Sequence, residues 1–404
     1  MKGLLVSTLF CLFTCIINTN INAQIKAPKF GKGIQVIGAD STYYLKIGFR
    51  FQNLVAANWA LANETEGYIA DYNSNALVRR SRLKFDGWAV SPKLKYKLEL
   101  SLSNRDNGGG GNLNEFGNAA NIILDAIISW NFVDNLSIRF GQSKLAGNRE
   151  RVISSSSLQF VDRSRLNSRF NIDRDVFIQL AYNHNIGDEF FLRESVSIAN
   201  GEGKNQIIGY NDGYDFTFRI EALPFGKFSS KGDYVGSAIK RESSPKLAFG
   251  LTYDNNNNAI RERGQLGSFI TNANGDYIGK NLNTFIADMM FKYEGISIMA
   301  EYADKATADD VPFVFDENDA LIGQYYTGSA FNIALGYMFK NHYELAVRYT
   351  DVTADTATDE THYTFGLNKF IVGHSLKVQT DVSFIERTVA QNFLLWRTQV
   401  EIHF

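Results

Sequence analysis

The sequence predicts an all-β fold, namely a sixteen-stranded antiparallel β-barrel that spans a membrane. Apolar and polar residues alternate from about Thr42 to the last residue, short and long connections take turns, and the apolar faces carry Tyr, Phe and Trp toward the segment ends. Successive side chains of a strand point to opposite faces, so each segment has one apolar and one polar face. A soluble sandwich would show the same alternation, but the aromatic segment ends and the charged mid-strand faces favour a lipid-facing barrel with a wet lumen.

The alternating segments give sixteen expected strands. Their centres lie near residues 50, 83, 97, 126, 139, 179, 195, 218, 250, 287, 299, 335, 347, 366, 380 and 398. Short turns are expected at 91–93, 133–135, 187–188, 294–295, 341–342 and 373–374, and long loops near 60–75, 104–120, 145–175, 201–213, 254–281, 304–327 and 351–361. The connection 226–245 is too long for a turn on the short-turn side, which leaves open a count that differs by two. Asn255 to Asn258 are expected to form a flexible loop tip.

The N-terminus predicts export. Residues 1–23 have the features of a secretory signal peptide, with Lys2 before an apolar stretch and the small residue Ala23 before the expected cut; a lipoprotein signal ending at Cys15 is the alternative. Residues 24–41 are expected to be a periplasmic segment, and residues 42–404 the barrel. Both cysteines, Cys11 and Cys15, lie in the removed part, which argues against a disulfide scaffold, a thiol enzyme or a Cys-based zinc protein.

The composition excludes other classes. A formal net charge of −2 shows no bulk basicity of the kind that nucleic-acid binding requires. After the N-terminus no run of 18 or more apolar residues occurs, which excludes a helical membrane protein.

The last segment is the most specific single signal. Trp396, Thr398, Val400, Ile402 and Phe404 share one face. A barrel strand with a carboxy-terminal aromatic residue resembles the signal that the outer-membrane assembly machinery reads. The expected location is therefore the outer membrane of a Gram-negative cell, where the barrel wall contacts lipid.

Basic residues gather where a channel would be narrowest. A sixteen-stranded barrel is wide enough for an aqueous channel, and residues 145–175 are the candidate constriction. Together with Lys144, this segment carries seven basic residues against four acidic ones, and the early strands add inward-facing Arg50, Arg80 and Arg82. Guanidinium groups match phosphate or carboxylate oxygens in pairs, and the hydroxyls of residues 154–157 add neutral donors. The pattern predicts passive diffusion of small anions, with no cofactor and no metal; alternatively, the arginines pair with acids such as Asp162 and only fix the loop.

Three motifs resemble a known family. They are Leu77-Val78-Arg79-Arg80-Ser81-Arg82-Leu83 with Gly87, Phe140-Gly141-Gln142-Ser143-Lys144, and Ser154-Ser155 followed by Phe160-Val161-Asp162-Arg163-Ser164. They are similar to motifs of the phosphate-selective porins O and P, and the resemblance covers essentially the whole exported chain. It implies a trimeric sixteen-stranded porin whose third loop folds inward, with a ladder of arginines leading to a phosphate site.

The resemblance also implies residue roles. Arg50, Arg79, Arg80 and Arg219 match the ladder, and Ser154, Ser155 and Arg163 match the constriction. With the basic residues above, the expected anion pathway consists of Arg50, Arg79, Arg80, Arg82, Lys144, Ser154, Ser155, Arg163 and Arg219.

The chain departs from the family pattern at three places. Ser101 stands where the family tends to carry an acid, with Glu99 two residues earlier, and Ala146-Gly147 replace an expected loop proline. Strict alternation puts Arg79 on the face opposite Arg80, so a bulge is needed if both reach the lumen. Other anions or small organic acids are therefore compatible with the same pattern.

Two rival functions remain. The scattered Ser, His and Asp residues suggest an outer-membrane enzyme such as a lipid hydrolase, which would need a catalytic cluster on the lipid-facing wall. A barrel that only binds partners through its external loops is the other rival. Both rivals predict negligible conductance.

Overall fold

The computed structural model describes residues 24–26, 29–61, 69–107, 121–206 and 213–404. The predicted signal peptide and parts of three predicted long loops lie outside the described residues.

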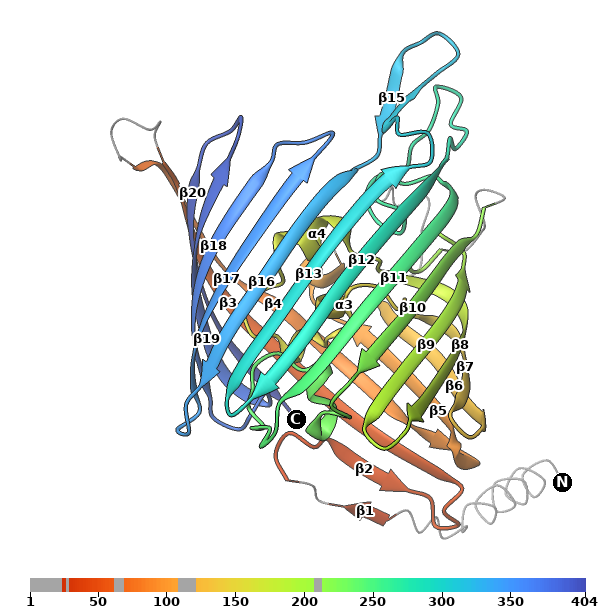
Figure 1. Ribbon diagram of the computed structural model, residues 1–404, viewed down its shortest axis with the longest axis vertical. Helices are drawn as coiled ribbons and strands as arrows, with labels where there is room; N and C mark the ends of the chain where they lie inside the picture. The colour runs from red at the N-terminus through yellow and green to blue at the C-terminus, as the bar shows by residue number, and fades with distance from the viewer. Residues whose placement is uncertain (1–23, 27–28, 62–68, 108–120, 207–212) are drawn as a thin grey trace, which may run out of the picture.

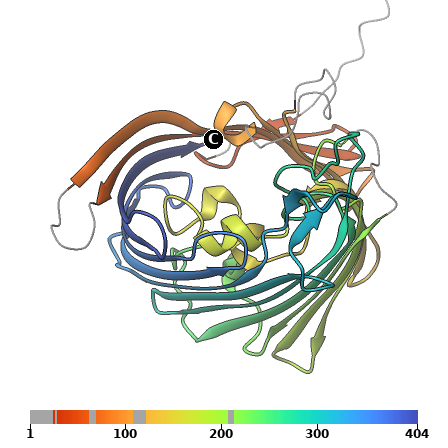
Figure 2. The ribbon, with the colours of Figure 1, turned by 90° about the horizontal axis from the view of Figure 1, so that it is seen from above.

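Among the described residues, sixteen strands close into one antiparallel barrel (Figures 1 and 2). They are β3 (Tyr43–Leu61), β4 (Ile69–Ala89), β5 (Ser91–Ser101), β6 (Ile123–Val133), β7 (Leu136–Lys144), β8 (Arg174–Ile186), β9 (Phe190–Ala199), β10 (Asp215–Leu223), β11 (Lys246–Ala259), β12 (Lys280–Tyr293), β13 (Ile296–Thr307), β16 (Gly328–Met338), β17 (Tyr343–Ala354), β18 (Glu360–Phe370), β19 (Leu376–Arg387) and β20 (Phe393–His403). Each pairs with the next along the chain, and β20 closes the barrel on β3, from Phe393 opposite Ala60 to His403 opposite Arg50. All sixteen expected centres fall within these strands, and the predicted fold is confirmed.

The wall has an apolar outside. Along β17, Leu345 and Val347 are 42% and 47% exposed. The residues that alternate with them, Glu344, Ala346 and Arg348, are buried on the inside of the barrel. In an outer-membrane barrel such outward side chains contact lipid, and short turns face the periplasm while long loops face the exterior. None of the helices formed by the described residues is long and apolar enough to cross a membrane.

A small hairpin stands at the short-turn end. β1 (Gln24–Lys26) pairs with β2 (Ile34–Ile37), and β2 pairs with the first residues of β3 (Figure 1).

Several expected loops are partly strand; the loop 304–327, for example, contains the hairpin of β14 (Phe313–Phe315) and β15 (Leu321–Gln324). Residues 69–75 belong to β4 and pair with the end of β3, as far as Ile69 opposite Leu61. Asn255 to Asn258, expected to be a flexible tip, lie within β11. Asn is rare in strands because of its weak β-propensity, but the ladders of the neighbouring strands override that preference here.

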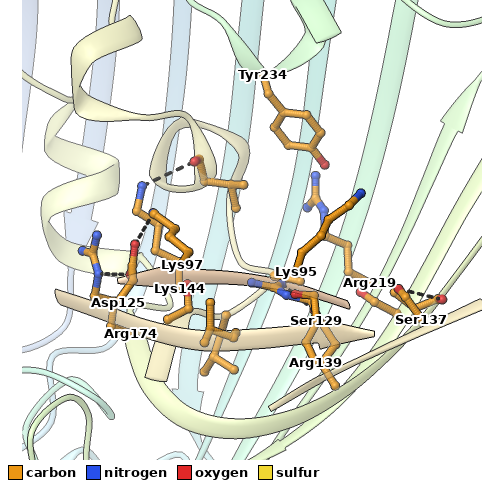
Figure 3. Close-up of a pocket in the computed structure, with 18 of the residues that line it drawn as sticks. Lys95, Lys97, Asp125, Ser129, Ser137, Arg139, Lys144, Arg174, Arg219 and Tyr234 are labelled. Carbon is orange, nitrogen blue, oxygen red and sulfur yellow. Dashed lines mark hydrogen bonds and ion pairs between the residues drawn. The ribbon is translucent and has the colours of Figure 1, made fainter. Parts of the chain in front are cut away.

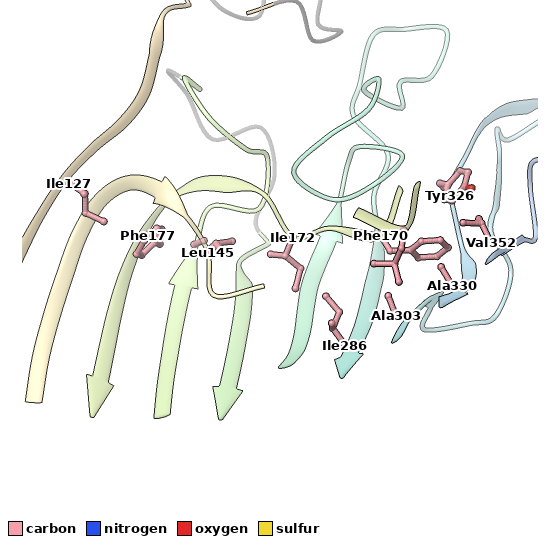
Figure 4. Close-up of a cluster of buried hydrophobic side chains, with 12 residues drawn as sticks. Ile127, Leu145, Phe170, Ile172, Phe177, Ile286, Ala303, Tyr326, Ala330 and Val352 are labelled. Carbon is pink, nitrogen blue, oxygen red and sulfur yellow. The ribbon is translucent and has the colours of Figure 1, made fainter. Parts of the chain in front are cut away.

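Loop 3 (residues 145–173) folds into the lumen, as predicted (Figure 2). It contains α3 (Arg149–Val152), η2 (Ser155–Ser157) and α4 (Arg165–Phe170). Leu145, Phe170 and Ile172 are at most 1% exposed and pack with residues of the inner wall, and the Phe170 ring meets Tyr326 edge-on at 5.5 Å (Figure 4). Burial of each such side chain contributes about 1.5–3 kcal/mol, so apolar contacts fix loop 3 against β6, β8 and β9 as well as against the β12–β17 side.

The connection 226–245 does not add strands. It forms η3 (Ser229–Tyr234) and inserts into the lumen from the short-turn end, where Gly236 N–H donates to the Ser157 carbonyl of loop 3 at 2.7 Å. We call residues 226–245 the inserted turn. The expected alternative of a different strand count is thereby excluded.

We predict that Val347→Arg destabilises the barrel in the membrane by about 2–4 kcal/mol, because it places a charge at mid-strand on the lipid face. The measurement is reversible folding into lipid vesicles, followed by heat-modifiable electrophoretic mobility. Thr353→Arg, on the same face at the strand end, is the control, with an expected cost of about 0–1 kcal/mol. Equal costs for both variants would contradict a lipid-facing outer wall.

Candidate functional site

The open part of the lumen is a cavity of about 530 Å³ between loop 3 and the wall formed by β4 to β10 (Figure 3). We call it the central cavity. Its lining includes eight basic residues (Arg82, Lys95, Lys97, Arg139, Lys144, Arg174, Arg193, Arg219), four acidic residues (Glu99, Asp125, Glu194, Glu221) and six serines (Ser129, Ser137, Ser143, Ser154, Ser155, Ser195). The wall of this cavity is thus both basic and rich in neutral hydroxyl donors.

Five of the nine residues expected in the anion pathway line this cavity. They are Arg82, Lys144, Ser154, Ser155 and Arg219. Arg79 lines a second cavity nearer the exterior, whereas Arg50, Arg80 and Arg163 line neither.

The arginines of β3 and β4 point inward but are held by acids. Arg50 Nη1 lies 3.2 Å from Glu401 Oε1, and its Nη2 donates to Ser155 Oγ at 2.5 Å. Arg80 donates to Gln52 Oε1 at 2.7 Å and to Asp162 Oδ1 at 3.2 Å. These two side chains therefore connect the barrel wall to loop 3.

Arg82 is held most tightly. It donates to both oxygens of Asp106, at 2.5 and 2.8 Å, and to Glu99 at 2.8 Å. Asp106 lies in α2 (Asn104–Asn107), outside the strands. Burial would raise the pKa of the Asp106 carboxyl, but the Arg82 guanidinium outweighs that effect and holds this pKa below its ordinary value.

Arg79 reaches the lumen through a β-bulge. Gln52 of β3 faces Arg80 and Asn53 faces Val78, so Arg79 is the extra residue on β4. Its Nη2 donates to Asp162 Oδ2 at 3.0 Å, beside the Arg80 contact to the other carboxylate oxygen. Burial alone would raise the pKa of Asp162, but the two guanidiniums hold it well below its ordinary range. The β-bulge that was expected to let both Arg79 and Arg80 reach the lumen is therefore present.

Two basic residues at loop 3, Lys144 and Arg163, bind backbone carbonyls, whereas Arg151 and Arg165 pair with Asp173 and Glu360. Lys144 Nζ donates to the carbonyls of Arg151, Val152 and Ile153 at 2.6–3.3 Å. Arg163 donates to the carbonyls of Glu150 and Ile153 at 2.8 and 2.7 Å. Lys144 and Arg163 thus brace loop 3 through its backbone carbonyls.

Arg219 belongs to a buried charge cluster. It donates to both oxygens of Asp288, at 2.7 and 3.1 Å, and to Glu221, while Arg149 of loop 3 contacts the same two carboxylates at 2.8 and 3.1 Å. A Cβ at position 250 would lie 2.4 Å from Arg219 Nη2, so Gly250 makes room for this side chain. Paired in this way, the two guanidiniums keep two acids of the inner wall neutralised.

The inserted turn completes the cluster. Tyr234 O–H donates to Glu221 Oε2, Arg193 pairs with Asp233, and Arg149 Nη1 donates to the Asp233 carbonyl. The Tyr234 ring also lies 5.2 Å from the guanidinium of Arg193. Tyr234 lines the central cavity, so this turn narrows the lumen from the side opposite the external loops (Figure 3).

Three cations of the central cavity make no ion pair among the described residues. They are Lys95, Arg139 and Lys144. Lys95 is exposed, and Arg139 donates only to the neutral Gln179, at 2.7 Å. Lys95 and Arg139 are therefore cations of the cavity wall that no carboxylate of the described residues contacts directly.

Three lining residues were not predicted from the sequence, namely Arg139, Arg193 and Tyr234. Arg139 of β7 and Arg193 of β9 stand at polar positions of alternating strands. That alternation could have predicted that their side chains point inward. For Tyr234 no such signal exists, because the pattern of a turn does not reveal that the turn enters the lumen.

His374, one of the scattered residues that suggested an enzyme, makes structural contacts. His374 Nε2 lies 3.2 Å from the Gly236 carbonyl and Nδ1 lies 3.4 Å from Lys377 Nζ, so its ring is occupied by these neighbours. No group of three or more His, Cys, Asp or Glu side chains among the described residues is arranged to hold a metal ion.

Comparison with solved structures identifies the architecture. The anion-selective porin from Comamonas acidovorans superimposes with a TM-score of 0.51 at 10% identity, over 90% of this chain and 100% of that one. The outer-membrane channel DcaP of Acinetobacter baumannii gives a TM-score of 0.50 at 12% identity, over 89% and 97% of the two chains. At such identities the likeness concerns the fold alone.

Sequence comparison identifies the family. No curated protein gives a significant match. The family model of the phosphate-selective porins O and P matches residues 49–302, more than half of the chain. This outer-membrane porin therefore belongs to the phosphate-selective porin O and P family.

Proposed function

We propose that the porin passes small anions by diffusion through the central cavity, with phosphate or related oxyanions as the main solutes. The observation that carries this proposal is the excess of basic over acidic residues, eight against four, around the open lumen. The name of the family supports phosphate as the solute.

The electrostatics of the cavity are suited to transit. A unit charge 4 Å from an opposite charge gains about 1 kcal/mol in water and about 4 kcal/mol at an effective dielectric constant near 20. Lys95 and Arg139, which make no ion pair with any described residue, therefore attract an anion, while the ion pairs of Arg82 and Arg219 moderate the field. Conduction needs several moderate sites rather than one deep trap, and this mixture provides them.

The expected anion pathway is part of this proposal in a modified form. Arg82, Lys144, Ser154, Ser155 and Arg219 would contact the solute directly. Arg50, Arg79, Arg80 and Arg163 would act by fixing loop 3 and by contributing longer-range positive potential. We further propose that the protein needs no cofactor and carries no enzymatic activity.

We predict that the double variant Lys95→Glu/Arg139→Glu loses anion preference, because it replaces two positive charges of the cavity by two negative ones. The measurement is the zero-current potential of the purified protein in planar bilayers across a KCl gradient, at low ionic strength where screening is weak. Lys340→Glu, on an exposed turn outside the cavity, is the matched control. An unchanged potential in the double variant would refute the role of these cations, and negligible conductance of the wild type would favour the enzyme or the binding barrel.

We predict that Tyr234→Ala raises single-channel conductance, since removal of the ring enlarges the central cavity. Tyr234→Phe keeps the ring and loses only the hydroxyl bond to Glu221, so its conductance should stay near that of the wild type. If the Ala and Phe variants conduct equally, the inserted turn does not limit the passage.

We also propose that three chains associate, which rests on the family alone. Native mass measurement of the detergent-solubilised protein tests this assembly, and a monomeric mass would contradict it.

A further inference from the structure

A second cavity opens toward the long-loop end of the barrel. It measures about 320 Å³ and lies where β20, β3 and β4 run side by side, at the left of Figure 1. We call it the outer cavity. A volume near 300 Å³ is at the lower bound of ordinary small-molecule sites.

The neutral polar side chains that line the outer cavity are amides rather than hydroxyls. Asn58 of β3 and Asn73 and Asn75 of β4 line it, and Asn58 and Asn73 face each other across the two strands. Asn58 Oδ1 is buried and has no hydrogen-bond partner among the described residues. An unpaired buried polar atom is costly, and a bound solute with a donor group would satisfy it.

Three arginines and the carboxylate of Asp162 make up the charged part of this lining, and Arg105 has no ion-pair partner among the described residues. Arg79 is paired with Asp162 at 3.0 Å, and Arg397 makes two bonds to Asp381, at 2.8 and 3.0 Å. Arg105 of α2 also lines the cavity and makes no ion pair among the described residues. Its guanidinium can bind a carboxylate through two parallel hydrogen bonds.

The remaining lining is apolar. Leu54, Leu77 and Leu395 lie on the three neighbouring strands, together with Ala56 and Ala57. The central cavity, by contrast, is lined by serines and charged residues. Apolar walls with a few placed polar groups are typical of sites for organic molecules, whereas a bare inorganic oxyanion gains nothing from leucines.

We infer that the outer cavity binds a small organic anion with an aliphatic body, whose carboxylate is held by Arg105 and whose hydroxyl donates to Asn58. This inference rests on the proposed function, in that such a solute would then enter the central cavity. It names a class of solute that differs from inorganic phosphate in having an apolar body.

The test is calorimetric titration of the detergent-purified full chain with 6-hydroxyhexanoate, with hexanoate as the matched ligand without the hydroxyl, and with inorganic phosphate. The wild type should bind 6-hydroxyhexanoate about tenfold more tightly than hexanoate, which corresponds to ~1.4 kcal/mol. Asn58→Leu should abolish this difference between the two ligands. Arg105→Gln should weaken both about tenfold and leave phosphate binding unchanged.

Asn318→Leu, on an exposed loop outside both cavities, is the control and should bind all three probes like the wild type; heat-modifiable mobility confirms that each variant is folded. The inference is overturned if Asn58→Leu keeps the ligand difference, if Arg105→Gln binds like the wild type, or if phosphate competes equally and depends equally on Arg105. The titration does not need ion flow, so loss of anion selectivity in bilayers would refute the proposed function while leaving this site standing.

Discussion

Every feature of this molecule depends on the need to pair all backbone N–H and C=O groups inside hydrocarbon. A strand wall satisfies that need only when it has no free edge, because each unpaired group would cost several kcal/mol in lipid. The pairing of β20 with β3 removes the last edge. Closure then fixes the side chains: alternate residues must be apolar toward lipid, and the others face a lumen where charges are tolerated.

The lumen shows how those charges are tolerated. Most inward arginines lie against carboxylates that come from distant parts of the chain, such as Arg50 with Glu401 and Arg149 with Asp288. A lone buried charge would be strongly unfavourable, and removal of one partner leaves the other uncompensated. Ion pairs such as Arg149–Asp288 and Arg193–Asp233 hold loop 3 and the inserted turn in the lumen. In the proposed function, selectivity rests on Lys95 and Arg139, which make no ion pair among the described residues.

The strands could be predicted from the sequence because period-two alternation is a local property. The bulge at Arg79 could be anticipated too, since two adjacent arginines cannot otherwise share one face. The partners of the arginines could not, because Glu401 and Asp288 lie far from them along the chain and only the closed barrel brings them together.

Other features were missed although a signal existed. Around residues 285–300 apolar side chains occupy both faces, as with Ile286, Met290 and Met299 on the inside. Such a loss of alternation is typical of a strand covered on both sides, and here loop 3 and the inserted turn provide the inner cover. The strand ends that contain Asn73 and Asn255 were predicted as loops for the opposite reason, since asparagines interrupt the alternation of apolar and polar residues.

The central claim is that uncompensated positive charge in an open lumen makes this porin prefer anions. The zero-current potential of the wild-type protein in a planar bilayer, measured across a tenfold KCl gradient, tests it most directly. The account predicts a potential whose sign shows that chloride permeates more readily than potassium. This potential should shift toward zero when the salt concentration on both sides is raised, because salt screens the charges of the lumen. A potential of the opposite sign, set by potassium, would contradict it.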